Sequence, residues 1–372
     1  MTFSLCMIVK NGEKTLERCL ESVKGVFDEI IIVDTGSFDR TKPVSLRYTD
    51  KIYDYAWNEN FADARNYSFS KAKGDYIMWL DADDVLEKSE KEKLISLKET
   101  ASAKTDVFMM KYAVSFDKNG RETFTYYRER LLKRERNFKW KGFVHEVITP
   151  TGNVEFCDIT VKHLPSESEN RDPARNLRMY ENYVSRGGIL DARQKYYYAR
   201  ELYYNGRNEK ASAVFEDFLR DKSAWPPDKL GAVYVLYDIY GKDNPEKAGE
   251  ALAKGLAGDF LAPQLFCLAG DRMLERGKYR EAVLWYKTAL LCPKDYRKFG
   301  FVTVDYEEYY PYMQLCLCYD RLGDRVTANK YNMKAKNIKP DSEEVKYNEK
   351  YFENVLKDGK LSENGVENES EM

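Results

Sequence analysis

The sequence predicts two domains of different fold class: an α/β domain with a mostly parallel, doubly wound sheet, followed by an all-α domain of helical repeats. Three observations lead to this prediction. Apolar runs of strand length alternate with helical periodicity through the first half of the chain. Beyond Pro165 such strand-like runs almost disappear. In their place, small residues, tyrosines and prolines recur at the spacing of a repeat built from paired helices.

The composition excludes several classes of function. The chain has 372 residues, of which 43% are hydrophobic and 33% charged, as in ordinary soluble globular proteins. Its net charge of −2 argues against nucleic-acid binding, which needs a basic face. No run approaches the roughly 20 apolar residues of a membrane span, and the first nine residues lack the basic start of a signal peptide. Seven cysteines without paired spacing indicate small core residues in a reducing compartment, so we expect a cytoplasmic protein.

Strands and helices alternate from the N-terminus. The first apolar run ends at the turn residues 10–12, and the next strand ends at Asp34. Such alternation is typical of βαβ units, in which helices cover both faces of a sheet. The pattern predicts strands at 4–9, 29–33, 51–57, 76–80, 107–116, 124–133 and 159–163, with helices at 16–23, 61–72 and 175–184.

The strand at 76–80 runs directly into three carboxylates, Asp81, Asp83 and Asp84. Ligands bind at the carboxyl ends of the strands in sheets of this kind. Asp81 and Asp83 lie two residues apart and would hold one hard cation, while a diphosphate fills its remaining coordination sites. The alternative is that Asp84 caps a helix beginning near Leu86, but one cap needs only one aspartate. The pattern therefore favours a metal-diphosphate site.

Asp34 ends a second strand, and it could accept a hydrogen bond from a base N–H or a ribose hydroxyl. The alternative role is a turn-forming aspartate before Gly36. The sequence contains neither the glycine-rich dinucleotide fingerprint nor a P-loop. We therefore expect the phosphates to be bound by the metal and by cations such as Arg65.

Four stretches in order carry a specific resemblance: residues 4–13, 31–41, 57–66 and 79–84. Through them, residues 3 to about 165 resemble family-2 glycosyltransferases with the A-type, nucleotide-sugar-binding fold. The resemblance implies a nucleoside-diphosphate sugar as donor, with a UDP-sugar expected. It also implies that the nucleotide contacts Asn11, Asp34, Arg65 and Asp81. Thr35 departs from the family pattern, because many relatives carry at this position a second aspartate that contacts uracil. The preference for one nucleotide base therefore rests on Asp34.

The segment Trp140-Lys-Gly-Phe-Val-His-Glu-Val147 resembles the glycine loop and acidic motif at the acceptor side of such enzymes. The resemblance implies that Glu146 is the catalytic base, with His145 beside it. If residues 144–149 form a strand, these two side chains point to opposite faces. Relatives with this W-x-G-x-x-H-E pattern include bacteriocin-peptide S-glycosyltransferases and bacterial surface-glycan transferases.

His163 closes the run at 159–163 and matches the late histidine that ligates the metal in many of these enzymes. The implied ligands of Mg²⁺ or Mn²⁺ are thus Asp83, Asp81 and His163. The alternative for His163 is a structural histidine with satisfied hydrogen bonds.

The second half repeats a pattern that matches the tetratricopeptide repeat, whose nominal length is 34 residues. Small residues at these positions let paired helices approach closely and stack on the next pair. Residues 295–306 form an insertion rich in aromatic residues. The matching positions are Gly277, Tyr279, Ala282, Tyr286, Ala289 and Pro293, then Gly323, Ala328, Ala335 and Pro340, with weaker copies at Ala199, Leu202, Gly206, Ala211 and Phe215 and at Leu236, Ile239, Ala248 and Leu252.

Composition shifts set the expected domain boundaries. Residues 1–165 form the nucleotide-sugar-binding domain, 166–189 a linker with a connecting helix, 190–356 the repeat domain, and 357–372 a polar, acidic and disordered tail. We expect the repeats to present the acceptor, or a second subunit in a homodimer, and to take no part in the chemistry.

Together these features predict an inverting, metal-dependent glycosyltransferase. A peptide cysteine, serine or threonine and a bacterial glycan both remain open as acceptor. The rival interpretation is a non-catalytic repeat adapter that carries a degenerate transferase domain. Carboxylates at every expected position speak against this rival.

Overall fold

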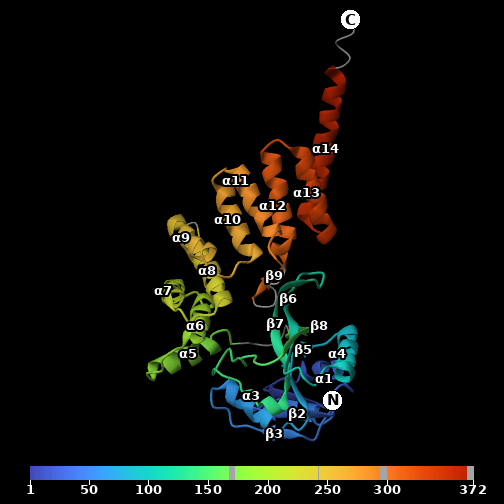
Figure 1. The fold of residues 1–372 in the computed structure, drawn as a ribbon, viewed down its shortest axis with the longest axis vertical. Coiled ribbons are helices and arrows are strands. Elements are labelled where there is room, and N and C mark those ends of the chain that lie inside the picture. Colours follow the sequence, from blue (N-terminus) through green and yellow to red (C-terminus); the bar gives the residue numbers. More distant parts are fainter. Residues whose placement is uncertain (167–171, 242, 294–299, 367–372) are drawn as a thin grey trace. The chain divides into compact units, whose positions relative to one another are not determined.

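The computed structural model describes residues 1–166, 172–241, 243–293 and 300–366 (Figure 1). The chain divides into two compact units. The first contains Met1–Asp228 together with Arg297–Val302, and the second contains Lys229–Tyr296 together with Thr303–Met372.

The first unit is built on a nine-stranded sheet of order β3-β2-β1-β4-β7-β6-β8-β5, with β9 paired to β7. Parallel pairs join β1 to β2, β1 to β4, β2 to β3 and β6 to β8. Antiparallel pairs join β4 to β7, β6 to β7 and β5 to β8. This arrangement confirms the predicted mostly parallel sheet. The strands are β1 Phe3–Val9, β2 Glu29–Asp34, β3 Ile52–Asp54, β4 Tyr76–Trp79, β5 Asp84–Val85, β6 Val107–Phe116, β7 Glu122–Lys133, β8 Val154–His163 and β9 Val302–Thr303.

Helices cover both faces of the parallel part of the sheet, because side chains alternate along each strand. Leu5 of β1 packs in one core with Leu16 of α1 and Leu94 of α4. Its neighbour Cys6 belongs to a second core with Phe69 of α3. The sheet is therefore doubly wound, as predicted. The helices of this part are α1 Leu16–Ser22, α2 Thr41–Ser45, α3 Phe61–Ser70 and α4 Lys88–Thr100.

The remaining helices follow one another to the end of the described chain. The predicted domain boundary was residue 165, whereas the first compact unit extends to Asp228 and includes α5 to α7. The last helix is continuous to Val366, although a disordered tail was expected from residue 357, since a formed helix gains one hydrogen bond per added residue. These helices are α5 Arg175–Ser185, α6 Ala192–Tyr204, α7 Asn208–Arg220, α8 Pro226–Tyr240, α9 Pro245–Leu256, α10 Pro263–Glu275, α11 Tyr279–Leu290, α12 Tyr309–Arg321, α13 Arg325–Ile338 and α14 Glu343–Val366.

The helix pairs of the second unit confirm the predicted repeats. Gly277 and Gly323, with φ of 69° and 87°, connect α10 to α11 and α12 to α13. Tyr286 of α11 is fully buried, and its ring would lie 2.6 Å from a Cβ placed on Gly270 of α10. A glycine at this point therefore lets the two helices approach closely. Part of the predicted insertion, residues 295–299, lies outside the described residues; its remainder forms β9 and a 3₁₀ turn at Val304–Glu307.

None of the seven cysteines, all of which lie in the described part of the chain, forms a disulfide bond, and six of them are buried, as expected for core residues. In the part of the chain that the structure describes, none of the helices combines the length and the apolar character needed to cross a membrane.

Candidate active site

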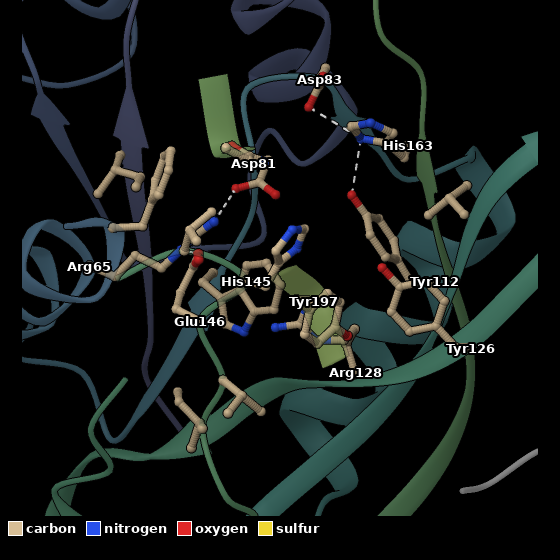
Figure 2. Close-up of a pocket in the computed structure, with 18 of the residues that line it drawn as sticks. Arg65, Asp81, Asp83, Tyr112, Tyr126, Arg128, His145, Glu146, His163 and Tyr197 are labelled. Carbon is tan, nitrogen blue, oxygen red and sulfur yellow. Dashed lines mark hydrogen bonds and ion pairs between the residues drawn. The ribbon is translucent and has the colours of Figure 1, made fainter. Parts of the chain in front are cut away.

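The carboxyl ends of β1, β2 and β4 open into a cavity of about 1840 Å³ in the first unit (Figure 2). The same cavity is lined by β6 and β7, by the turn around Glu146 and by α6. Of the residues predicted to form the site, only Asp34 does not line it. Those that do are Asn11, Arg65, Asp81, Asp83, His145, Glu146 and His163.

Arg65 of α3 joins two of the predicted carboxylates. Its Nη2 donates to Asp81 Oδ1 at 2.7 Å, and its Nε donates to Glu146 Oε1 at 2.6 Å. The guanidinium lies 5.0 Å and 4.9 Å from the ring centres of Trp79 and Trp140, so aromatic faces stabilise its charge. Burial opposes ionisation of Asp81, but Arg65 outweighs it and lowers the pKa of this carboxyl to about 2. Arg65 therefore holds two carboxylates in place; its contact with phosphate remains a prediction.

A second group forms where β5 pairs with β8. The register places Asp84 opposite His163, and candidate ligand atoms of Asp83, Asp84 and His163 all lie within 4.8 Å of one another. Nδ1 of His163 is 3.3 Å from Asp83 Oδ1. Burial disfavours the imidazolium, but the hydrogen bonds with Asp83 and Asp84 outweigh it and raise the pKa of His163 to about 9. The structure thus brings the predicted ligands Asp83 and His163 together, whereas Asp81 lies against Arg65.

Asp84 has a supporting place behind this pair. It is fully buried, its Oδ2 accepts from Arg130 Nη1 at 2.9 Å, and its Oδ1 accepts from the Tyr112 hydroxyl at 2.8 Å. The helix-cap alternative for Asp84 is wrong, because α4 begins at Lys88 with Glu87 at its N-cap. Both oxygens of Asp84 already accept hydrogen bonds, so Asp83 and His163, which line the cavity, are the residues that fit a divalent cation.

The segment that carries Glu146 is a tight turn, not a strand from residue 144. Lys141 and Val147 exchange backbone hydrogen bonds of 2.9 and 3.0 Å and close the turn. Gly142 and His145 have φ of 94° and 52°, and an ordinary side chain at a positive φ stores some strain. Neighbouring side chains still diverge: Glu146 reaches Arg65, whereas the ring of His145 lies against α6 (Figure 2).

His145 is held entirely by the helices that follow the α/β domain. Its Nε2 lies 2.7 Å from Glu201 Oε1, which also accepts from Asn176 Nδ2 of α5 at 3.1 Å. The Tyr197 ring stacks on the imidazole at 4.2 Å, and Arg193 donates to the His145 carbonyl at 3.3 Å. Burial lowers the pKa of His145, and the hydrogen bond from His145 lowers the pKa of Glu201 against its own burial. Nε2 therefore carries the proton that it donates to the Glu201 carboxylate.

These contacts bring α6, the first helix of the predicted repeat domain, against the turn that carries Glu146; that the repeats take no part in the chemistry stays a prediction. Sequence reasoning missed Glu201, Asn176, Arg193 and Tyr197, and no motif marks them. Their common feature is a place on the inward face of two helices, which only the packing of those helices on the turn reveals.

At the ends of β1 and β2, Asp34 forms the turn that was its alternative role. Its Oδ1 accepts from the backbone N–H groups of Gly36 and Ser37 at 2.9 and 2.8 Å. Its Oδ2 is buried and has no hydrogen-bond partner among the described residues. Asn11 ties the two strand ends together, since its N–H donates to Ser37 Oγ and its Oδ1 accepts from Phe38.

The family model described as Glycosyl transferase family 2 matches residues 4–153. Similar proteins include the SPbeta prophage-derived glycosyltransferase SunS of Bacillus subtilis, 35% identical over 95 residues, and the putative glycosyltransferase EpsH of the same species, 32% identical over 125 residues. The matched segments cover 25% and 32% of this chain, and 22% and 36% of those proteins. A TPR repeat-containing protein of Synechococcus elongatus is 46% identical over 83 residues, 22% of this chain and 21% of that protein. The chain thus spans well under two thirds of each relative.

Among solved structures, S. aureus TarS 1–349 in complex with UDP aligns at 14% identity with a TM-score of 0.34, over 78% of this chain and 90% of that one. So low a score carries no argument about this protein. The family match coincides with the strands whose carboxyl ends line the cavity and with the turn that carries Glu146. Residues 4–153 therefore form a glycosyltransferase family 2 domain.

Proposed function

We propose that the protein is an inverting, metal-dependent glycosyltransferase that uses a nucleoside-diphosphate sugar, with UDP as the expected nucleotide. The observation that carries the proposal is the arrangement of the cavity. Arg65 holds Asp81 and Glu146, while Asp83, which follows β4, and His163, which ends β8, form a separate pair.

Asp83 and His163 would hold Mg²⁺ or Mn²⁺, whose bound charge neutralises a leaving diphosphate. A carboxylate oxygen and an imidazole nitrogen 3.3 Å apart are suited to share one cation. Asp84 keeps the ligands in place through Arg130 and Tyr112 and stays off the cavity wall. Asp34 Oδ2 and Asn11 would meet the nucleoside at the ends of β2 and β1.

Glu146 is the proposed general base. Arg65 fixes its Oε1, while its Oε2 accepts no hydrogen bond from any residue that the structure describes, and Glu146 lines the cavity. An oxygen placed in this way can take the proton of an acceptor hydroxyl or thiol. His145 suits this role less well, because its Nε2 already donates to Glu201. A carboxylate also stabilises the positive charge that develops on the sugar, which an imidazolium would oppose.

The acceptor is a peptide side chain or a bacterial glycan, and the helical repeats would present it or a second copy of the chain.

The test begins with purified full-length protein, Mn²⁺ and a panel of nucleotide sugars, in which slow hydrolysis identifies the donor. Glu146→Gln should lower turnover at least about a hundredfold and leave UDP affinity unchanged. Glu135→Gln, on an exposed turn of the same domain, is the matched control. An unchanged turnover number for Glu146→Gln from about pH 6 to 9 would contradict the assignment.

A further inference from the structure

Among the residues of α6 that line the cavity, four recur at helical spacing: Arg193, Tyr197, Arg200 and Tyr204. Their separations of four, three and four residues place them on one face of the helix. Trp225 and Asp228, at the start of α8, line the same cavity. We call these six residues the α6 wall. The proposed chemistry at Asp83 and Glu146 does not use the side chains of Arg200, Tyr204, Trp225 or Asp228.

Asp228 is the most unusual member of the α6 wall. It is 2% exposed, and its Oδ1 has no hydrogen-bond partner among the described residues. Its Oδ2 lies 3.9 Å from Arg193 Nη1, which is beyond hydrogen-bond distance. Burial raises the pKa of Asp228 to about 6, although Arg193 and Arg200 oppose this. A buried carboxylate oxygen without a donor destabilises the fold, and a ligand hydroxyl that donates to it would relieve this.

The α6 wall also offers aromatic surface and a cation. Tyr204 is 60% exposed and Trp225 is 46% exposed, which is unusual for rings of this size. Arg200 donates to the Tyr204 hydroxyl at 2.5 Å, and its guanidinium lies 5.7 Å from the ring centre of Phe301. Within the described chain no carboxylate forms an ion pair with Arg200, so its remaining N–H groups have no charged partner there.

We propose that the α6 wall binds a sugar ring of the acceptor. The proposal rests on the proposed function, because it assigns a substrate class to the part of the cavity away from the donor groups. A sugar presents an apolar C–H face, which packs on aromatic rings, and hydroxyl groups that both donate and accept. Asp228 Oδ1 would accept from one hydroxyl, and Arg200 or Arg193 would donate to another.

A peptide acceptor fits the α6 wall less well. An extended peptide that binds by strand addition needs main-chain hydrogen bonds from a sheet edge. A helix face offers none, because its N–H and C=O groups are already bonded within the helix. The observations therefore favour a glycan over a peptide.

The test measures direct binding to the full-length protein with UDP and Mn²⁺ in excess, so that the donor part of the cavity is filled. The probes are glucose, N-acetylglucosamine and their β-1,4-linked disaccharides, compared with Gly-Ser-Gly and Gly-Cys-Gly tripeptides. Saturation-transfer NMR detects whether each probe binds, and titration of the protein with the probe gives its dissociation constant. We expect dissociation constants in the millimolar range for sugars, as for a few hydrogen bonds and one stacked ring.

Asp228→Asn and Trp225→Ala should weaken sugar binding at least about tenfold. Trp225→Phe keeps a ring and should restore most of the affinity, which separates stacking from a general loss of structure. Asp217→Asn removes an exposed carboxylate of α7 and serves as the control. UDP affinity should be the same in all variants.

The proposal is overturned if sugars bind Asp228→Asn and Trp225→Ala as tightly as the wild type, or if no probe sugar binds. It is also overturned if the tripeptides bind and the sugars do not, a result that would assign the α6 wall to a peptide acceptor. Absence of UDP binding in the wild type would instead refute the proposed function, while the comparison of sugar affinities could still be made without UDP.

Discussion

Replacing Glu201 by alanine tests whether α6 holds the turn that carries the proposed base. The variant removes a 2.7 Å hydrogen bond to His145 Nε2 and a 3.1 Å bond from Asn176, both at a carboxylate that is 6% exposed. Losing one hydrogen bond to a charged group costs about 1.5–3 kcal/mol, so the loss of both bonds should lower the free energy of unfolding of the first unit by about 3–6 kcal/mol. Glu201→Gln keeps an oxygen that can accept from His145, and it should lose about 1 kcal/mol.

The variant should also lower the catalytic rate. His145 has a φ of 52°, and the turn keeps this conformation only while surrounding contacts impose it. Without Glu201 we expect the turn to shift and to carry Glu146 with it. A displacement of about 1 Å can lower the turnover number about a hundredfold. UDP affinity should change little, because Asp83 follows β4 and Asp34 ends β2, so neither belongs to the turn that carries Glu146.

The assay makes use of the fact that the chain has only two histidines. In protein labelled with ¹⁵N-histidine, the ring nitrogen shifts report the tautomer of each, and His163→Gln assigns the signals. Wild-type His145 should carry its proton on Nε2, and Glu201→Ala should lose this single tautomer. Glu209→Ala, at an exposed position of α7, should match the wild type.

One result would refute the reasoning. If Glu201→Ala unfolds more easily but keeps the His145 tautomer and the wild-type turnover number, Glu201 only packs α6 and does not position the turn.

Three further predictions follow from other parts of the molecule. Asp83→Ala should abolish the metal-dependent part of the UDP affinity measured by calorimetry. If EDTA lowers the UDP affinity of the variant and of the wild type equally, Asp83 is not a ligand of the metal. Gly270→Ala should lower the melting temperature of the second unit, because the added methyl group would overpack against the buried ring of Tyr286 and cost about 1–3 kcal/mol in the free energy of unfolding. Gly249→Ala is the control and should be tolerated, because its methyl group meets only the flexible end of the Arg272 side chain. The pKa of Asp228 is raised to about 6, so the contribution of this carboxyl to stability is present in full below about pH 4 and is lost as the pH rises through 6. In denaturation experiments, Asp228→Asn should remove on the order of 2–3 kcal/mol of this pH dependence from the free energy of unfolding. An unchanged dependence of stability on pH would contradict this prediction.

The order of strands and helices in the α/β domain could be predicted because each depends on residues close together in the chain. The apolar run at 76–79 must form a buried strand and must end where charge begins, and β4 does so. Buried positions of the repeats, such as Ala282 and Ala335, follow in the same way from helical spacing, since each lies on the face turned toward a neighbouring helix.

Only the tertiary structure decided which charged groups meet. Glu146 lies 81 residues from Arg65, and Glu201 lies 56 residues from His145, so no local pattern can report either contact. The carboxylate beside His163 depends on the register of β5 against β8, which places Asp84 opposite the histidine and brings Asp83 to its Nδ1. Spacing along the chain predicts that Asp81 and Asp83 share one cation, because it measures distance along a single strand end. The partner of each carboxylate is instead set by the order and register of strands, and by α6 packing on a turn from which it is distant in sequence.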